Sequence, residues 1–133
     1  MDHPLTMQWE KQLKKLFDQV DDYLEDNFGS DYSLHPNRAY RGSTSNKEHD
    51  GLFNVGASFS SGFGAKYGRG YVIDVHISTL DEVPKEAKDK IINEAVHKAS
   101  ELLPIYFPNR DLKIVRDGNV FKISGDFKLG KGH

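Results

Sequence analysis

Cysteine is absent from the 133-residue chain. Without a thiol the protein can form no disulfide, use no thiolate nucleophile, and hold no cysteine-ligated zinc or iron–sulfur cluster. We therefore exclude these classes of site from the start. The absence also fits a protein from a reducing compartment.

Long apolar runs and an excess of positive charge are missing too. No run approaches the roughly 18 apolar residues that a transmembrane helix needs, and no basic-then-apolar signal pattern opens the chain. We expect a cytoplasmic protein without membrane insertion. With 18 Lys and Arg against 20 Asp and Glu, the net charge is −2. A globally basic nucleic-acid binder is therefore disfavoured, although nucleic-acid binding by a local basic patch stays open.

What the chain does contain is typical of a soluble globular domain. Hydrophobic residues make up 37% and charged residues 29% of the sequence, and a chain of this length can bury a substantial core. We predict a single domain over residues 1–133, with frayed ends at 1–5 and 129–133 and a long loop at 30–50.

A strand followed by a helix is the clearest pattern in the middle of the chain. Apolar side chains alternate with polar ones over residues 71–79, as in a strand with one face on a core. After a short acidic connection, apolar residues recur every three or four positions from Ala87 to Leu103, which predicts a helix. Pro84 suits its first turn, and we expect Pro104 to end it. The apolar connector that follows, residues 105–108, is predicted to be buried.

Another helix and two hairpins complete the predicted fold. Apolar residues at helical spacing predict a helix from near Met7 to Phe28, with Trp9 and Tyr23 in the core or, alternatively, at a dimer surface. Residues 52–63 alternate and pair with the strand at 71. Asp117-Gly118 predicts a tight hairpin turn, with Ile114 opposite Phe121 and the lysines 113 and 122 opposite each other. The predicted class is an α+β two-layer sandwich of α-β-β-α-β-β order, with two helices on one face of a four-stranded, largely antiparallel sheet.

Basic residues offer one hypothesis about function. The loop at 30–50 is either disordered or a plain surface excursion, or it is a ligand-contacting loop. Basic side chains in this loop, around the first hairpin and on the predicted sheet face could bind an anion or stack and bind nucleic acid. The candidate anion-binding residues are Arg38, Arg41, Lys66, Arg69, Lys113 and Lys122.

Asp74 and His76 offer a second hypothesis, because alternation places both on one face of a strand. Such a pair could bind a divalent metal or orient a general base. A third group would come from elsewhere, with His35, His49 and Asp117 as candidates. A small hydrolase with an Asp/His base is one consequence of this pairing, and two solvated polar side chains are the alternative.

Residues 52–117 resemble the cytosolic domain of cation diffusion facilitator transporters. The resemblance is carried by the segment from Tyr71 to Ile77, the acidic link at 81–84, and Phe107-Pro108 before the next strand. It implies a metal-binding role for His76 and, after the third strand, for Asp117. Lys88 or Asp89 and Val115 stand where that family has further histidines. The resemblance therefore implies a dimerising regulatory module with an altered metal site.

Taken together, these patterns favour a non-enzymatic binding or regulatory module. We expect it to act as a homodimer or with an unknown protein partner. The possible cofactor is a divalent metal at Asp74, His76 and Asp117. A small anionic ligand or nucleic acid at the basic residues, and hydrolysis by an Asp/His base, are the alternatives.

Overall fold

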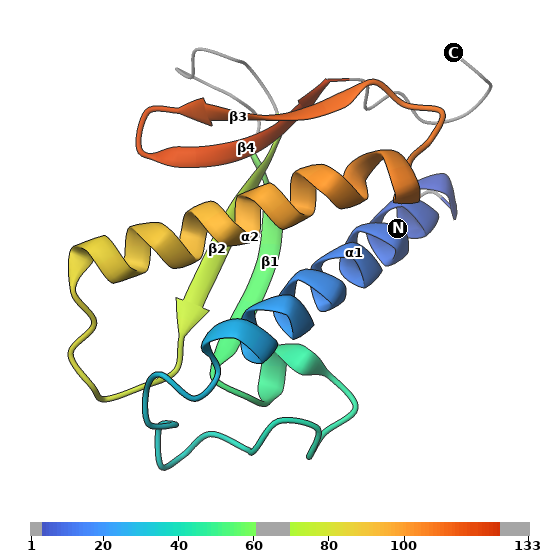
Figure 1. The fold of residues 1–133 in the computed structure, drawn as a ribbon. Helices are drawn as coiled ribbons and strands as arrows, with labels where there is room; N and C mark the ends of the chain where they lie inside the picture. The colour runs from blue at the N-terminus through green and yellow to red at the C-terminus, as the bar shows by residue number, and fades with distance from the viewer. Residues whose placement is uncertain (1–3, 61–69, 126–133) are drawn as a thin grey trace.

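The computed structural model describes residues 4–60 and 70–125 (Figure 1). Its elements follow the predicted α-β-β-α-β-β order, with one additional 3₁₀ turn. They are α1 (Pro4–Phe28), η1 (Lys47–His49), β1 (Phe53–Ser60), β2 (Gly70–Ile77), α2 (Lys85–Tyr106), β3 (Leu112–Asp117) and β4 (Val120–Gly125). The predicted α+β class is confirmed.

The four strands form one antiparallel sheet in the order β1-β2-β4-β3. β1 and β2 pair along their whole length, from Phe53–Ile77 to Ser60–Gly70. β4 pairs with β2 over only three residues, 71–73. Beyond Ile73 the β3–β4 hairpin diverges from β2 (Figure 1), so the second half of β2 has no strand neighbour on that side among the described residues.

Both helices lie on the same side of the sheet, and the core fills the space between these two layers (Figure 1). From α1, Leu16, Val20 and Leu24 are fully buried, as the helical spacing predicted. Trp9 packs on Phe107 with 4.4 Å between ring centroids, which joins the start of α1 to the end of α2. The prediction of Trp9 as a core residue is confirmed. Tyr23 is half-buried, and its hydroxyl donates to Glu94 Oε1 of α2 at 2.7 Å.

The ends of both helices differ from the prediction. α1 begins at Pro4 rather than near Met7, so Pro4 and Leu5 belong to a helix. α2 runs through Pro104 to Tyr106, because burial of the preceding leucines, 102 and 103, outweighs the local preference of proline. The connector is not uniformly buried: Phe107 is, but Ile105 is 69% exposed.

The turn between β3 and β4 also differs, by one residue. Asp117 pairs with Val120, so Gly118 and Asn119 are the central residues. Gly118 has φ +65° and takes the first central position, where a type II′ hairpin turn requires glycine. Ile114 therefore pairs with Ile123 instead of Phe121. The shift moves each partner by two positions, so the predicted face of Leu112, Ile114, Phe121 and Ile123 is retained.

The new register removes the predicted contact between two lysines. Lys122 lies opposite Val115, and Lys113 lies opposite Ser124. Lys122 is only 2% exposed, and its Nζ donates to Asp117 Oδ2 at 2.9 Å. Burial of an ammonium group requires such a partner. The prediction that the lysines 113 and 122 lie opposite each other is therefore wrong.

Candidate functional site

The structure places the sequence-predicted pair Asp74 and His76 on the outward face of β2, where both are exposed. Asp74 lies opposite Gly56, and His76 lies opposite Asn54. No hydrogen bond joins the two side chains. A catalytic Asp/His base normally uses such a bond to orient the imidazole, so this geometry lacks one feature of the hydrolase hypothesis.

Asp117 interacts with a different residue: its carboxylate forms an ion pair with the ammonium of Lys122. Among residues 4–60 and 70–125, no group of three or more His, Asp or Glu side chains is arranged to hold a metal ion. The proposed divalent-metal ligands Asp74, His76 and Asp117 thus do not form such a group.

The basic residues do not gather into one patch within the described chain. Arg41 bridges Asp22 and Asp26 on α1, with N–O distances of 3.2 and 3.0 Å. Lys122 is buried, whereas Lys113 is exposed on β3. Lys66 and Arg69 lie outside the described residues.

Arg38 differs from Arg41 in its partners. Its Nε donates to the carbonyl of Gly51, and its Nη2 donates to the carbonyl of Asp50, both at 3.0 Å. The loop at 30–50 is therefore fastened from within: Ala39 and Asp50 form an isolated parallel bridge, and the Asp50 carboxylate accepts from the Thr44 backbone and hydroxyl.

Buried carboxyl groups occur where α1 meets the end of this loop. Glu25 accepts from the backbone N–H of Phe53 at 3.0 Å, and desolvation raises the pKa of its carboxyl. Burial, together with the neighbouring charges of Glu25 and Asp22, raises the pKa of Asp21 to about 8. At Asp50 burial favours a higher pKa, but hydrogen bonds from Thr44 and Gly42 and the charge of Lys47 together outweigh it and lower the pKa. These groups join α1 to the loop.

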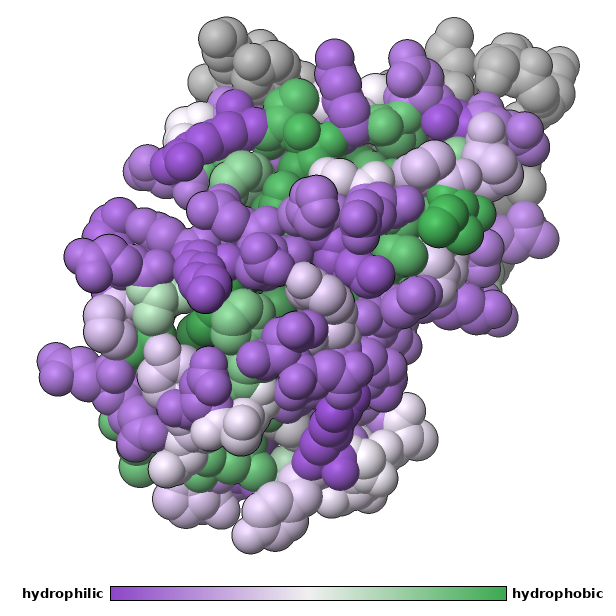
Figure 2. Space-filling model, viewed as in Figure 1, coloured by the Kyte–Doolittle hydropathy of each residue, from purple (hydrophilic) through white to green (hydrophobic). Residues whose placement is uncertain are grey.

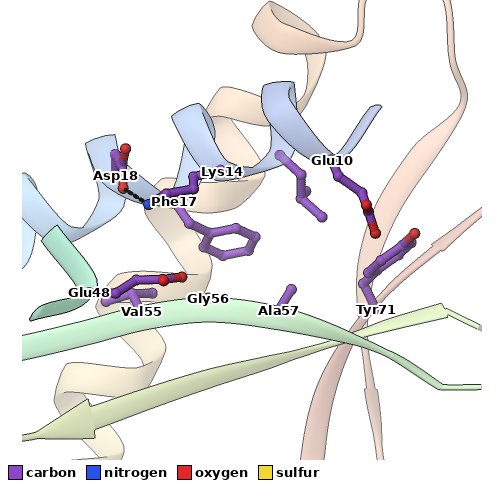
Figure 3. A pocket seen from close by; sticks show the side chains of 10 residues that line it. Glu10, Lys14, Phe17, Asp18, Glu48, Val55, Gly56, Ala57 and Tyr71 are labelled. Carbon is purple, nitrogen blue, oxygen red and sulfur yellow. Dashed lines mark hydrogen bonds and ion pairs between the residues drawn. The ribbon is translucent and has the colours of Figure 1, made fainter. Parts of the chain in front are cut away.

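A small hollow separates α1 from β1 (Figure 3). Its volume is about 120 Å³, and small residues at Gly56 and Ala57 leave the space. Glu10 and Tyr71 lie at one end, and Glu48 lies over Gly56 at the other (Figure 3). The ion pair of Lys14 with Asp18, at 3.0 Å, closes one side. The hollow is too small for most organic ligands, since ligand pockets usually measure about 300–1,000 Å³.

Two larger hollows lie along the unpaired half of β2. One, of about 250 Å³, lies at the end of β2 beside the start of α2. The other, of about 260 Å³, lies between β2, α2 and the tip of the β3–β4 hairpin. Both are lined by Val75 and Ile92. Figure 2 shows polar side chains along the outer face of α2 and apolar ones between α2 and the hairpin. We call the unpaired edge of residues 74–77 with these two hollows the β2 edge groove.

A fourth hollow lies where the long loop meets the end of β2. Its volume is about 360 Å³, and both His35 and His76 line it. The sequence had suggested His35 as a companion of His76, and the fold brings them to one hollow. Sequence reasoning missed Ile92 as a site residue, because its helical spacing marks it only as a core position.

The arrangement of these elements defines a class of protein, a small α+β domain with a partly open four-stranded sheet. Residues 4–125 match a protein family described as "Uncharacterised protein". The chain belongs to this family. It is 47% identical over 108 residues to an uncharacterised protein of Borreliella burgdorferi, which covers 81% of this chain and 84% of that protein. No solved structure matches the chain.

Neither α1 nor α2 combines the length and apolar character needed to cross a bilayer.

Proposed function

We propose that the protein is a non-enzymatic binding module that takes an extended segment of a partner polypeptide along the β2 edge groove. The observation that carries this proposal is the sheet edge that β4 leaves unpaired after Ile73. An exposed strand edge offers main-chain donors and acceptors to an added strand, and this mode of peptide recognition recurs in proteins.

The direction of the backbone groups supports the proposal. Ser78 donates its N–H to the carbonyl of Leu52, toward β1. Because main-chain groups alternate in direction along a strand, those of Val75 point the opposite way, to the open edge. The β2–β4 ladder ends at the Ile73–Phe121 pair, so the N–H and carbonyl of Val75 lie beyond it.

The two hollows supply places for side chains of an added strand. Alternate side chains of a strand point to the same face, roughly 6.6 Å apart. The hollows lie one after the other along β2 and share Val75 and Ile92. Val83 and Ile91 add apolar lining to one hollow, and Phe121 adds it to the other. We infer a partner segment with apolar side chains at positions i and i+2.

The experiment is a selection from a phage-displayed library of random linear dodecapeptides. Enriched peptides, synthesised with a fluorophore, should carry apolar residues at i and i+2 and bind the wild-type protein in fluorescence polarisation. Val75→Pro removes the outward N–H, and we expect it to weaken binding by tenfold or more. Val75→Ala is the matched control, because it also loses the valine side chain but keeps the N–H. Thermal melts of both variants establish that they fold.

Hydrogen exchange tests the edge without a change of sequence. In the free protein the amide of Val75 should exchange faster than that of Ile73, which lies within the ladder, and a bound peptide should protect it. No enriched peptide, or equal binding by the proline and alanine variants, would contradict the proposal. If sedimentation shows a wild-type dimer that Val75→Pro dissociates, a second copy of the chain occupies the edge instead.

A further inference from the structure

The hollow between the long loop and the end of β2, which we call the histidine hollow, is chemically unlike the β2 edge groove. Its lining comes from His35, Asn37 and Arg38 of the loop and from residues 76–79 of the strand end. This lining contains two imidazoles and one guanidinium but no carboxylate. The composition favours a ligand that accepts hydrogen bonds and carries negative charge.

The ring of His35 is held as a hydrogen-bond donor. The backbone N–H of Asn37 donates to its Nδ1 at 3.0 Å, so this nitrogen must be the unprotonated one. The proton of the neutral ring then lies on Nε2. A metal ion needs a free lone pair, which this Nε2 does not offer, whereas an oxyanion needs the N–H. The backbone of His35 is fixed too, because its N–H donates to the carbonyl of Ser78 at 2.8 Å.

Arg38 supplies positive charge that no carboxylate of the described residues neutralises. Its Nε and Nη2 bond to the neutral carbonyl oxygens of Gly51 and Asp50, and no ion pair of Arg38 is found within residues 4–60 and 70–125. Arg41, in contrast, forms ion pairs with two aspartates of α1. The side chain of Arg38 is partly buried, and partial burial strengthens its field on a bound anion relative to water.

Three acidic residues near the histidine hollow, Asp50, Asp74 and Asp81, do not line it, and two of them hold other hydrogen-bond partners. Asp50 turns its carboxylate to Thr44, and Asp81 accepts from the backbone N–H of Ser33 at 2.6 Å. Asp74 shares the outward face of β2 with His76 but lines the hollow beside the hairpin tip. The described lining of the histidine hollow thus contains no acidic residue, and Arg38 gives it one positive charge.

We propose that the histidine hollow binds a small oxyanion, the phosphate or carboxylate group of a small molecule. His35 Nε2–H and the imidazole of His76 donate hydrogen bonds, and Arg38 supplies the charge. This site goes beyond the proposed peptide binding and does not depend on it. His76 lines both the histidine hollow and one hollow of the β2 edge groove, whereas His35 and Arg38 line only the histidine hollow.

The test is an NMR titration of the full chain with inorganic phosphate and, separately, with acetate, at ionic strength held constant with chloride. We expect saturable shifts at His35, Asn37, His76 and Thr79 with at least one of the two anions. The anion that binds identifies the source chemistry as phosphate or carboxylate. Long-range proton–nitrogen spectra of the imidazoles should show the proton of His35 on Nε2 in the free protein.

His35→Phe keeps a ring of similar shape but removes the donor, so it should raise the dissociation constant about tenfold, and His76→Phe should raise it severalfold. His97→Phe is the matched control, because this exposed histidine of α2 lies away from the hollow beside Glu101, and it should leave binding unchanged. His35→Phe should leave peptide binding unchanged, because His35 does not line the β2 edge groove, and this separates the anion site from peptide binding. Non-saturable shifts, equal competition by chloride, or binding unaffected by His35→Phe would overturn the proposal.

Discussion

Gly42 in the long loop and Gly51 just after it have the same left-handed backbone but different surroundings. Gly42 has φ +82° and nothing within 4 Å of the place where a Cβ would lie. Gly51 has φ +77°, and a Cβ there would come within 2.3 Å of Glu25 Oε2. That carboxylate holds the backbone N–H of Phe53, so Gly51 makes room for a contact on which the start of β1 depends.

The two alanine variants should therefore differ in stability. Gly42→Ala has only the cost of the left-handed backbone, about 1 kcal/mol. Gly51→Ala has the same cost and also displaces Glu25, which leaves a buried N–H unpaired for roughly 2 kcal/mol more. Thermal melts measure both. Equal losses would mean that Glu25 is not held as the structure describes.

At the scale of the element, the β3–β4 hairpin depends on one lysine and not on the other. Lys122→Ala removes the buried partner of Asp117 and should destabilise the protein by about 3 kcal/mol. Lys113→Ala changes an exposed side chain of the same hairpin and should stay within about 0.5 kcal/mol of wild type. Urea unfolding of the two variants tests this difference, and a small effect at Lys122 would contradict the observed register.

The elements themselves could be predicted from sequence because their signals are local. Alternation identified β2, and helical spacing identified the buried stripe of α1. The register of the β3–β4 hairpin could not be predicted, since the predicted and observed registers place the same apolar residues on one face. The short pairing of β4 with β2 could not be predicted either, because it depends on how the two hairpins are oriented relative to each other. Of the candidate site, His76 was predicted, but the bond that fixes His35 as a donor depends on loop conformation.

At the scale of the whole molecule, the buried Asp21 makes stability depend on pH. Its pKa is raised from 3.8 to about 8 in the folded protein, so the fold favours the protonated form. This favourable contribution is complete below about pH 4, where the unfolded chain is protonated too, and it is lost as pH rises to 8. Asp22 and Asp50, with lowered pKa values, act in the opposite sense at acid pH.

Asp21→Asn replaces the carboxyl by a neutral group of similar size. We expect the variant to gain stability over wild type at pH 8 and to gain much less at pH 5, as measured by thermal melts in buffers of equal ionic strength. Asp31→Asn, at an exposed loop position, is the control and should show no such pH-dependent gain. A gain of equal size at both pH values would show that Asp21 is not held protonated.

The bridge between Ala39 and Asp50, reinforced by the bond from the Gly51 N–H to the Ala39 carbonyl at 2.9 Å, closes the second half of the long loop, residues 39–50, into a ring. Residues can be added inside such a closed loop at little cost in free energy, since loop-closure entropy grows only with the logarithm of length. The residues that close the loop, and the sheet next to them, need not move. The tip around Gly42 is therefore the point at which evolution can lengthen this chain, or an experimenter can insert an epitope, while the sheet and both hollows of the β2 edge groove keep their shape.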